Sequence, residues 1–272
     1  MSDRESDRVI DAVRSARPLD FTPVIDTHGH FGAFHYLWVP GGDDPDAVLR
    51  EMEAYGIRMA CLSASGLAAA GALSRANDDV LRAVKRHPGR ILGYCTLSSV
   101  RPERQLDELK RCYDLGLRVG VKMHRYNQPA YKLADKFLDP IFEFLSRRRL
   151  IYINHTLGPL DELREVARRW PDVTFLNGHG DVNYATLGAD VPNVFANVCA
   201  MIQHGDIADL VRRCGAKHLL LGSDFGLFQA GFGIGPVAFA DIPEEDKLDI
   251  LGRNALAIFE RMEWWAPSRL SV

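Results

Sequence analysis

The stretch Val24–His30, which reads VIDTHGH, has the composition of a short buried strand that ends in two histidines. Side chains alternate between the two faces of a strand, so His28 and His30 are expected to point the same way, with Asp26 one step behind them. Two imidazoles side by side at a strand end can share one cation. A surface His-Gly-His loop would have the same composition, so the interpretation depends on the rest of the chain.

Outward from this stretch, mostly uncharged strand-like segments alternate with amphipathic helix-like segments. Eight such strands, with helices between them, predict a parallel sheet covered by helices. The further strands are expected at 59–63, 91–97, 119–124, 150–155, 173–179, 194–198 and 218–224, and helices at 45–55, 77–85, 102–115, 140–149, 160–170, 207–214 and 244–260.

The length of 272 residues suits a (β/α)8 TIM barrel that forms a single domain over residues 1–272, with residues 1–22 as a helical N-terminal leader. An open doubly wound sheet is the alternative, but no GxGxxG fingerprint follows the first strand. Asn77 is expected to cap the helix 77–85. The glycine-containing segment 228–236 is expected to be a mobile lid or a plain turn, with anion binding as the less favoured reading.

Composition excludes several classes of function. The net charge is −3 and the basic residues are scattered, so a nucleic-acid partner is not expected. No apolar run approaches the roughly 20 residues that a membrane span needs. The charged N-terminus does not resemble a secretory signal, and five widely spaced cysteines are typical of reduced core thiols. A cytoplasmic protein with a small-molecule substrate is therefore expected.

Residues able to bind a metal or move a proton end five of the eight expected strands. In a barrel these strand ends lie on one rim, where active sites are built. Neutral imidazoles and a carboxylate suit Zn²⁺ or a similar divalent ion, whose bound water loses a proton near neutral pH. The alternative is a rim of histidines that are only hydrogen-bonded. The residues are His28 and His30, His124, His155, His179 and Asp224.

Several of these stretches resemble the amidohydrolase superfamily, and more narrowly its amidohydrolase-2 branch of metal-dependent TIM-barrel hydrolases and decarboxylases. They are His28–His30 (HGH), Val119–His124 (VGVKMH) and Gly222–Asp224 (GSD), and the tail Ile250–Phe259 is similar to the closing helix of that branch. The resemblance runs from about residue 24 to residue 260.

The resemblance implies a divalent metal, Zn²⁺ before Mn²⁺ or another ion. It makes His28, His30, His155 and Asp224 the metal ligands. It also implies that His179 is a catalytic histidine and that Asp224 shuttles the proton. A supporting position behind the ligands, or a ligand to a second metal, is the alternative for His179.

The fourth strand leaves the number of metals open. Superfamily members with two metals use a carbamylated lysine there as a bridge, which would be Lys122, whereas lysines in the amidohydrolase-2 pattern are usually unmodified. His124 and Arg125 are interpreted as substrate contacts, because a guanidinium at the rim suits a carboxylate. A solvated loop position is the alternative for Arg125. The aromatic residues Phe31, Phe34, Tyr36 and Trp38 follow the first strand and either line a substrate pocket or pack within the loop.

The leading hypothesis is a metal-dependent hydrolase that cleaves an amide, ester or lactone of a small molecule. The alternative is nonoxidative decarboxylation of a small aromatic or unsaturated acid, although decarboxylases of this branch often have a glutamate in place of His28. A barrel that binds a small molecule without chemistry is the third hypothesis. Trp264 and Trp265 are interpreted as packing or homo-oligomer contacts, and the substrate itself is not specified by the sequence.

Overall fold

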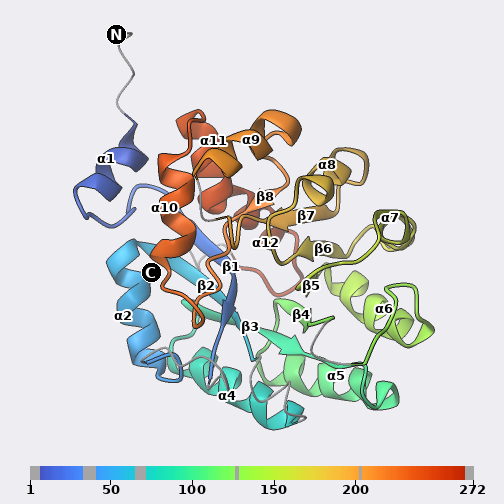
Figure 1. Cartoon of the computed structure of the whole chain (residues 1–272). Helices are drawn as coiled ribbons and strands as arrows, with labels where there is room; N and C mark the ends of the chain where they lie inside the picture. The colour runs from blue at the N-terminus through green and yellow to red at the C-terminus, as the bar shows by residue number, and fades with distance from the viewer. Residues whose placement is uncertain (1–6, 33–40, 65–71, 126–128, 202–203, 267–272) are drawn as a thin grey trace.

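The computed structural model describes residues 7–32, 41–64, 72–125, 129–201 and 204–266 (Figure 1). Phe34, Tyr36 and Trp38 lie outside the described residues, so their expected role as pocket lining stays a prediction. In the part of the chain that is described, no helix is both long and apolar enough to span a membrane.

Eight parallel strands form one sheet in which each strand pairs with its neighbours in sequence. The sheet closes on itself between the last strand and the first. There the Thr27 N–H donates to Leu221 O (2.9 Å) and the Asp224 N–H donates to His28 O (2.9 Å). The predicted (β/α)8 barrel is therefore confirmed. The strands are β1 (Val24–His30), β2 (Ile57–Ser63), β3 (Ile91–Thr96), β4 (Gly120–Met123), β5 (Ile151–Asn154), β6 (Thr174–Asn177), β7 (Val194–Asn197) and β8 (Leu219–Leu220).

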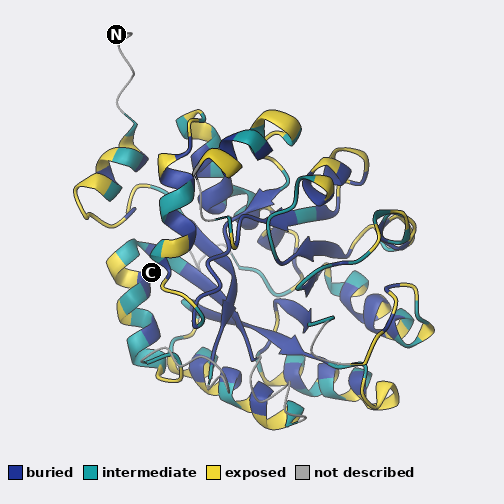
Figure 2. Cartoon of the chain, in the orientation of Figure 1, coloured by how far each residue is buried: buried dark blue, intermediate teal, exposed yellow. Residues whose placement is uncertain are grey.

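Helices surround the strands and turn their exposed faces outward (Figures 1 and 2). The strands themselves are largely buried on both faces, as their small number of charged residues predicts. The helices are α1 (Arg8–Arg14), α2 (Pro45–Tyr55), α4 (Leu73–Arg86), α5 (Gln105–Leu115), α6 (Asp139–Arg148), α7 (Leu160–Arg169), α8 (Val182–Asp190), α9 (His204–Cys214), α10 (Gly231–Phe239), α11 (Glu244–Leu248) and α12 (Asn254–Phe259), with 3₁₀ turns at Pro102–Arg104 and Lys136–Leu138.

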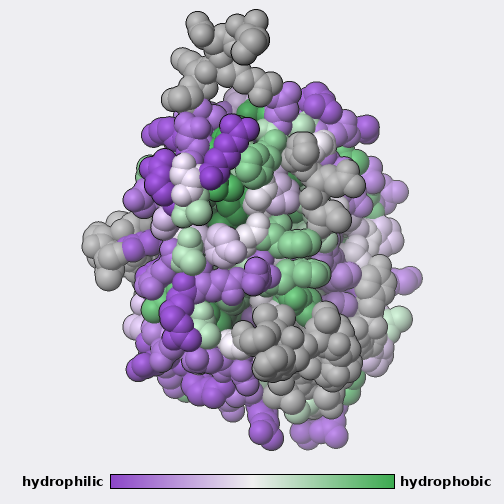
Figure 3. Space-filling model, turned by 60° about the vertical axis from the view of Figure 1, so that its left-hand side comes forward, coloured by the Kyte–Doolittle hydropathy of each residue, from purple (hydrophilic) through white to green (hydrophobic). Residues whose placement is uncertain are grey.

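Residues 244–259 form one helical stretch, in which a π-helical turn, Asp249–Arg253, joins α11 to α12. This matches the helix expected at 244–260. Trp264 and Trp265 follow it, and their rings lie 6.2 and 5.6 Å from the ring of Phe259. Both tryptophans therefore pack against Phe259, at the end of α12. The outer face shown in Figure 3 is largely hydrophilic, with more apolar residues toward its middle.

Asn77 is not a helix cap, because α4 begins four residues earlier, at Leu73. The side chain is fully buried and joins three elements. Its Nδ2 donates to Thr96 O (3.0 Å) and to the Glu108 carboxylate (2.9 Å), and its Oδ1 accepts from the Thr96 N–H (2.8 Å). An asparagine in a helix interior is tolerated here because its amide bonds to the main chain of Thr96, at the end of β3, and does not compete for the hydrogen bonds of its own helix.

The segment 228–236 is not a lid or a plain turn throughout, since α10 begins within it at Gly231. This helix has no polar face from which a helical period could be read, and it contains Pro236. Helix α8, between β6 and β7, also went unpredicted. Both helices lack the regular alternation of apolar and charged residues that marks the others.

Candidate metal centre

The imidazole of His28 is fixed by main-chain contacts at the end of β1. Its Nδ1–H donates to Gly178 O (2.7 Å), so the lone pair is on Nε2, which faces the site. Two glycines make room for this ring. A Cβ at Gly178 would lie 2.9 Å from His28 Cε1, and one at Gly222 would lie 2.9 Å from His28 Cβ.

Asp224 and His30 lie beside this ring. His30 Nε2 is 2.9 Å from Asp224 Oδ1, and His28 Nε2 is 3.5 Å from the same oxygen. Burial alone would raise the pKa of Asp224. The charge interaction with His28 and the hydrogen bond from His30 outweigh burial, and they hold the pKa below its usual value. The carboxylate is therefore ionised at neutral pH.

Asp26 connects the first and last strands beneath these groups. Its Oδ1 accepts from the N–H of His28 (3.1 Å) and of Ser223 (3.2 Å), and its other oxygen accepts from the Ser223 hydroxyl. Burial raises the pKa of Asp26 to about 7. The expected alternation on β1 thus puts Asp26 behind the histidines, where it supports the site without entering it.

Lys122, on β4, is buried and donates from Nζ to His28 Nε2 at 2.6 Å. Burial lowers the pKa of Lys122 to about 8, so the side chain is still largely protonated at pH 7. An ammonium group therefore lies against an atom that the resemblance assigns to metal binding. The sequence placed Lys122 near the site but gave no sign of this contact.

Strand register explains how the three later histidines meet. Met123 pairs with Asn154, so the residues that follow them, His124 and His155, stack with ring centroids 4.5 Å apart. His179, two residues past β6, has Nε2 2.7 Å from His155 Nδ1. Burial lowers the pKa of His124 to about 3 and that of His179 to about 4. These rings are therefore neutral at pH 7, which is the form that binds metals.

Arg125 is held by the loops that follow neighbouring strands. Its guanidinium donates to Leu157 O (3.1 Å) and Tyr131 O (3.0 Å), and its N–H donates to Asn154 Oδ1 (3.2 Å). These bonds order the rim around the site. A direct contact between Arg125 and a substrate carboxylate stays a prediction.

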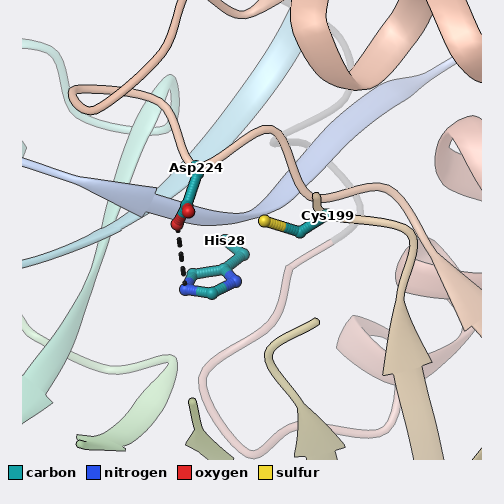
Figure 4. Close-up of side chains that lie close together, drawn as sticks. All are labelled: His28, Cys199 and Asp224. Atoms are coloured by element: carbon teal, nitrogen blue, oxygen red, sulfur yellow. Dashed lines mark ion pairs between the residues drawn. The ribbon is translucent and has the colours of Figure 1, made fainter. Parts of the chain in front are cut away.

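Cys199 is the residue that sequence reasoning missed. It lies two residues past β7 and is 1% exposed. Figure 4 shows its sulfur directed toward Asp224 and His28. The donor atoms of these three residues all lie within 4.8 Å of one another. The position just beyond a strand end was the available signal, but the residue was grouped with the core cysteines.

The residues fit a divalent cation. The Nε2 atoms of His28 and His30 lie 3.5 and 2.9 Å from Asp224 Oδ1, so three donor atoms suited to a cation converge on one place. The buried Nδ1 of His179 has no hydrogen-bond partner among the described residues, which leaves it available to a ligand. The structure pairs His155 with His179, and its assignment as a fourth ligand stays a prediction.

Comparisons with known proteins identify the family. Residues 25–261 match the amidohydrolase-2 family model, which is described as Amidohydrolase. A search among curated proteins finds no match to the chain. Similar solved structures show the same fold at low identity.

One is 2,6-dihydroxybenzoate decarboxylase complexed with 2,6-dihydroxybenzoate (TM-score 0.71, 17% identity, 88% of this chain and 99% of that chain). Another is a dihydroxybenzoic acid decarboxylase from Polaromonas sp. with bound manganese and the inhibitor 2-nitroresorcinol (0.67, 17%, 88% and 97%). A third is 4-oxalomesaconate hydratase from Rhodopseudomonas palustris (0.66, 15%, 88% and 96%). With the family model covering nearly the whole barrel, this chain belongs to the amidohydrolase-2 family.

Proposed function

We propose that the protein is a metal-dependent nonoxidative decarboxylase of a small hydroxylated aromatic acid. The observation that carries the proposal is the buried ammonium of Lys122 at 2.6 Å from His28, beside the histidines and Asp224. Two of the similar structures are decarboxylases of dihydroxybenzoates, which supports the same choice of substrate. Hydrolysis, which the sequence favoured, becomes the second candidate.

Charge explains why an acid suits this site. A divalent ion and the Lys122 ammonium would bring three positive charges, against one negative charge on Asp224. A site with excess positive charge and low exposure favours an anionic substrate over a neutral amide or ester. A hydroxybenzoate has a carboxylate that would bind to this positive charge. Its flat ring would pack against nearby rings such as the stacked His124 and His155.

His28, His30, His155 and Asp224 would hold the ion. It would supply Lewis-acid polarisation of the oxygen atoms of the bound acid. Lys122 would bind the acid's negative charge, and Arg125 would keep the rim ordered through its bonds to the main chain. The Nδ1 of His179 would accept or donate a hydrogen bond at a substrate oxygen.

Asp224 would move the proton. Because its pKa is below the usual value, Asp224 is ionised and must take up a proton before it can give one. A ring hydroxyl of the substrate provides that proton, leaving a phenolate. Asp224 then returns it to the ring carbon that carries the carboxylate, the C–C bond breaks, and CO₂ leaves. Carboxylate and hydroxyl thus become CO₂ and phenolate, and Asp224 is ionised again.

The test compares substrates that differ in one group, with the protein reloaded with Zn²⁺ or Mn²⁺. 2,6-Dihydroxybenzoate is expected to release CO₂ and resorcinol, whereas benzoate, which lacks the hydroxyls, is expected to release none. Asp224→Asn is expected to slow CO₂ release by about 10²–10⁴-fold, because it removes the proton carrier.

Hydrolysis is tested in the same samples with the methyl ester and the amide of the same acid. Cleavage of either without CO₂ release would contradict decarboxylation and favour the hydrolase. Binding of the acid with no product from any substrate, unchanged in Asp224→Asn and His179→Asn, would favour a barrel that binds without chemistry.

A further inference from the structure

Cys199 lies beside two of the candidate metal ligands, His28 and Asp224. Its sulfur, His28 and Asp224 form a buried group whose donor atoms all lie within 4.8 Å of one another. In a tetrahedral Zn²⁺ site with Zn–S of about 2.3 Å and Zn–N of about 2.0 Å, neighbouring donor atoms are about 3.5 Å apart. A shift of about 1 Å would therefore bring all three donors onto one ion.

The sulfur of Cys199 is directed toward Asp224 and His28, so the thiol and the carboxylate face the same point (Figure 4). A cation at that point would be bound by both side chains.

The backbone holds Cys199 in this position. Its carbonyl accepts from the Gly180 N–H (3.1 Å), which fastens it to the end of β6. The next residue, Ala200, has φ of +63°, and Asp224 has φ of +57°. The left-handed conformation is unfavourable for a residue other than glycine, so both neighbouring strand ends are strained, as at many functional sites.

The other cysteines lie elsewhere. Cys61, Cys95 and Cys112 are buried in β2, β3 and α5. Cys214, on α9, bonds through its sulfur to Leu210 O at 3.1 Å within the same helix. In the part of the chain that the structure describes, Cys199 alone among the cysteines belongs to such a group of candidate ligands.

We propose that Cys199 is a sulfur ligand of the metal centre and makes the site select Zn²⁺ over Mn²⁺. The inference rests on the proposed metal-dependent function and adds a ligand to it. Thiolate is a soft donor that favours Zn²⁺, whereas carboxylate, carbonyl and water oxygens suit Mn²⁺. One of the similar solved structures, a dihydroxybenzoic acid decarboxylase, contains bound manganese.

The test uses the whole chain, stripped of metal and titrated with Co²⁺, which absorbs strongly in the near ultraviolet when a thiolate binds it. Wild type is expected to show this charge-transfer band together with visible d–d bands. Cys199→Ser is expected to lose the charge-transfer band and keep the visible ones. Cys214→Ser, the matched control, is expected to keep both.

A second measurement concerns selectivity. The ratio of Zn²⁺ to Mn²⁺ affinity, measured by competition with a chelator, is expected to fall at least about tenfold in Cys199→Ser, mainly through weaker Zn²⁺ binding. An unchanged ratio would contradict the proposal.

The outcomes separate the two proposals. Co²⁺ binding without a charge-transfer band in wild type, or a band that survives in Cys199→Ser, overturns the sulfur ligand and leaves the proposed function intact. Failure of wild type to bind Co²⁺ or Zn²⁺ overturns both. If Cys199→Ser does not fold, X-ray absorption of the Zn²⁺-loaded wild type decides, since a sulfur at about 2.3 Å must be present.

Discussion

At the scale of single residues, the contact between Lys122 and His28 involves a nitrogen that the candidate metal centre would use. The ammonium donates to Nε2, so it occupies the lone pair that a metal would use. A pKa of about 8 leaves most of the lysine charged at pH 7. On the proposed function, metal binding would have to displace this positive charge, which would afterwards attract the acid.

Lys122→Met is expected to bind metal about tenfold more tightly at pH 7 and the carboxylate substrate more weakly. The substitution removes the hydrogen bond that competes with the metal and a positive charge that repels it. A tenfold gain in affinity corresponds to about 1.4 kcal/mol, which is modest for the loss of a charge at this separation. Chelator competition measures the metal affinity, and KM for the acid measures the second effect.

The surface substitution Lys85→Met on α4 is the control, and both values should stay at the wild-type level. We expect one metal per chain in both variants. Two metals per wild-type chain, with metal lost in Lys122→Met, would instead indicate the carbamylated bridge.

The histidines make the stability of the metal-free protein depend on pH. The pKa values of His28, His124, His155 and His179 are lowered in the folded chain, chiefly by burial. Between pH 6.5 and about 4, the unfolded chain therefore binds more protons at these residues. As the pH is lowered through this range, each such histidine lowers the free energy of unfolding by about 1.4 kcal/mol per pH unit. Asp26, with its pKa raised to about 7, acts in the opposite direction but accounts for one proton only.

His179→Gln is expected to make this pH dependence shallower, by up to about 1.4 kcal/mol per pH unit. Urea unfolding of both proteins in the presence of a chelator, at pH 6.5, 5.5 and 4.5, gives the two slopes. Because slopes are compared, a general loss of stability in the variant does not matter. Parallel curves would show that His179 titrates in the folded chain as it does in the unfolded one.

At the scale of elements, Asn77 fixes the end of β3 and the position of α5 from within α4. Asn77→Ala is expected to lower the free energy of unfolding by about 2–4 kcal/mol, because it leaves the buried Thr96 main-chain groups without their partners. Asp78→Ala changes the next residue, whose 57%-exposed side chain pairs with Arg111, and should cost less than about 1 kcal/mol. Urea unfolding compares them, and equal losses would contradict the buried role.

The same elements show what the sequence could predict. The strands were predicted because parallel strands buried on both faces contain few charged residues. Helices such as Pro45–Tyr55 were predicted because apolar residues recur with the helical period. Helices α8 and α10 lack that contrast between faces, so the rule had nothing to detect. Asn77 was misread because an asparagine near a helix start favours a cap, and only the packed structure shows a partner 19 residues away.

The site was predictable as a set of strand ends but not as a set of contacts. A barrel topology alone puts His28, His30, His124, His155, His179 and Asp224 on one rim. Strand register then decides that His124 stacks on His155 and that His179 pairs with His155. The tilt of the strands brings Lys122 to His28 and Cys199 to Asp224. Register and tilt arise from packing the whole barrel, so no local pattern reveals them.

At the scale of the whole molecule, the candidate metal centre lies where the barrel closes. Three of its proposed ligands, His28, His30 and Asp224, come from the two sides of the joint between β1 and β8, and His30 and Asp224 are 194 positions apart in sequence. That joint contains few strand hydrogen bonds because β8 is only Leu219–Leu220. An ion bound by His28, His30 and Asp224 would cross-link the first and last strands. Metal loading should therefore stabilise the entire fold and not only the site.

Adding Zn²⁺ at about 100 times its dissociation constant to chelator-treated protein is expected to stabilise the fold by about 2.7 kcal/mol. For a chain of this size, that corresponds to a rise in Tm of roughly 5–10 °C. Scanning calorimetry measures the rise, and excess chelator should reverse it. Asp224→Asn, which removes a charged donor from one side of the joint, should show a much smaller rise. An equal rise in that variant would mean that Zn²⁺ binds elsewhere. The joint between β1 and β8 would then be stabilised by protein contacts alone.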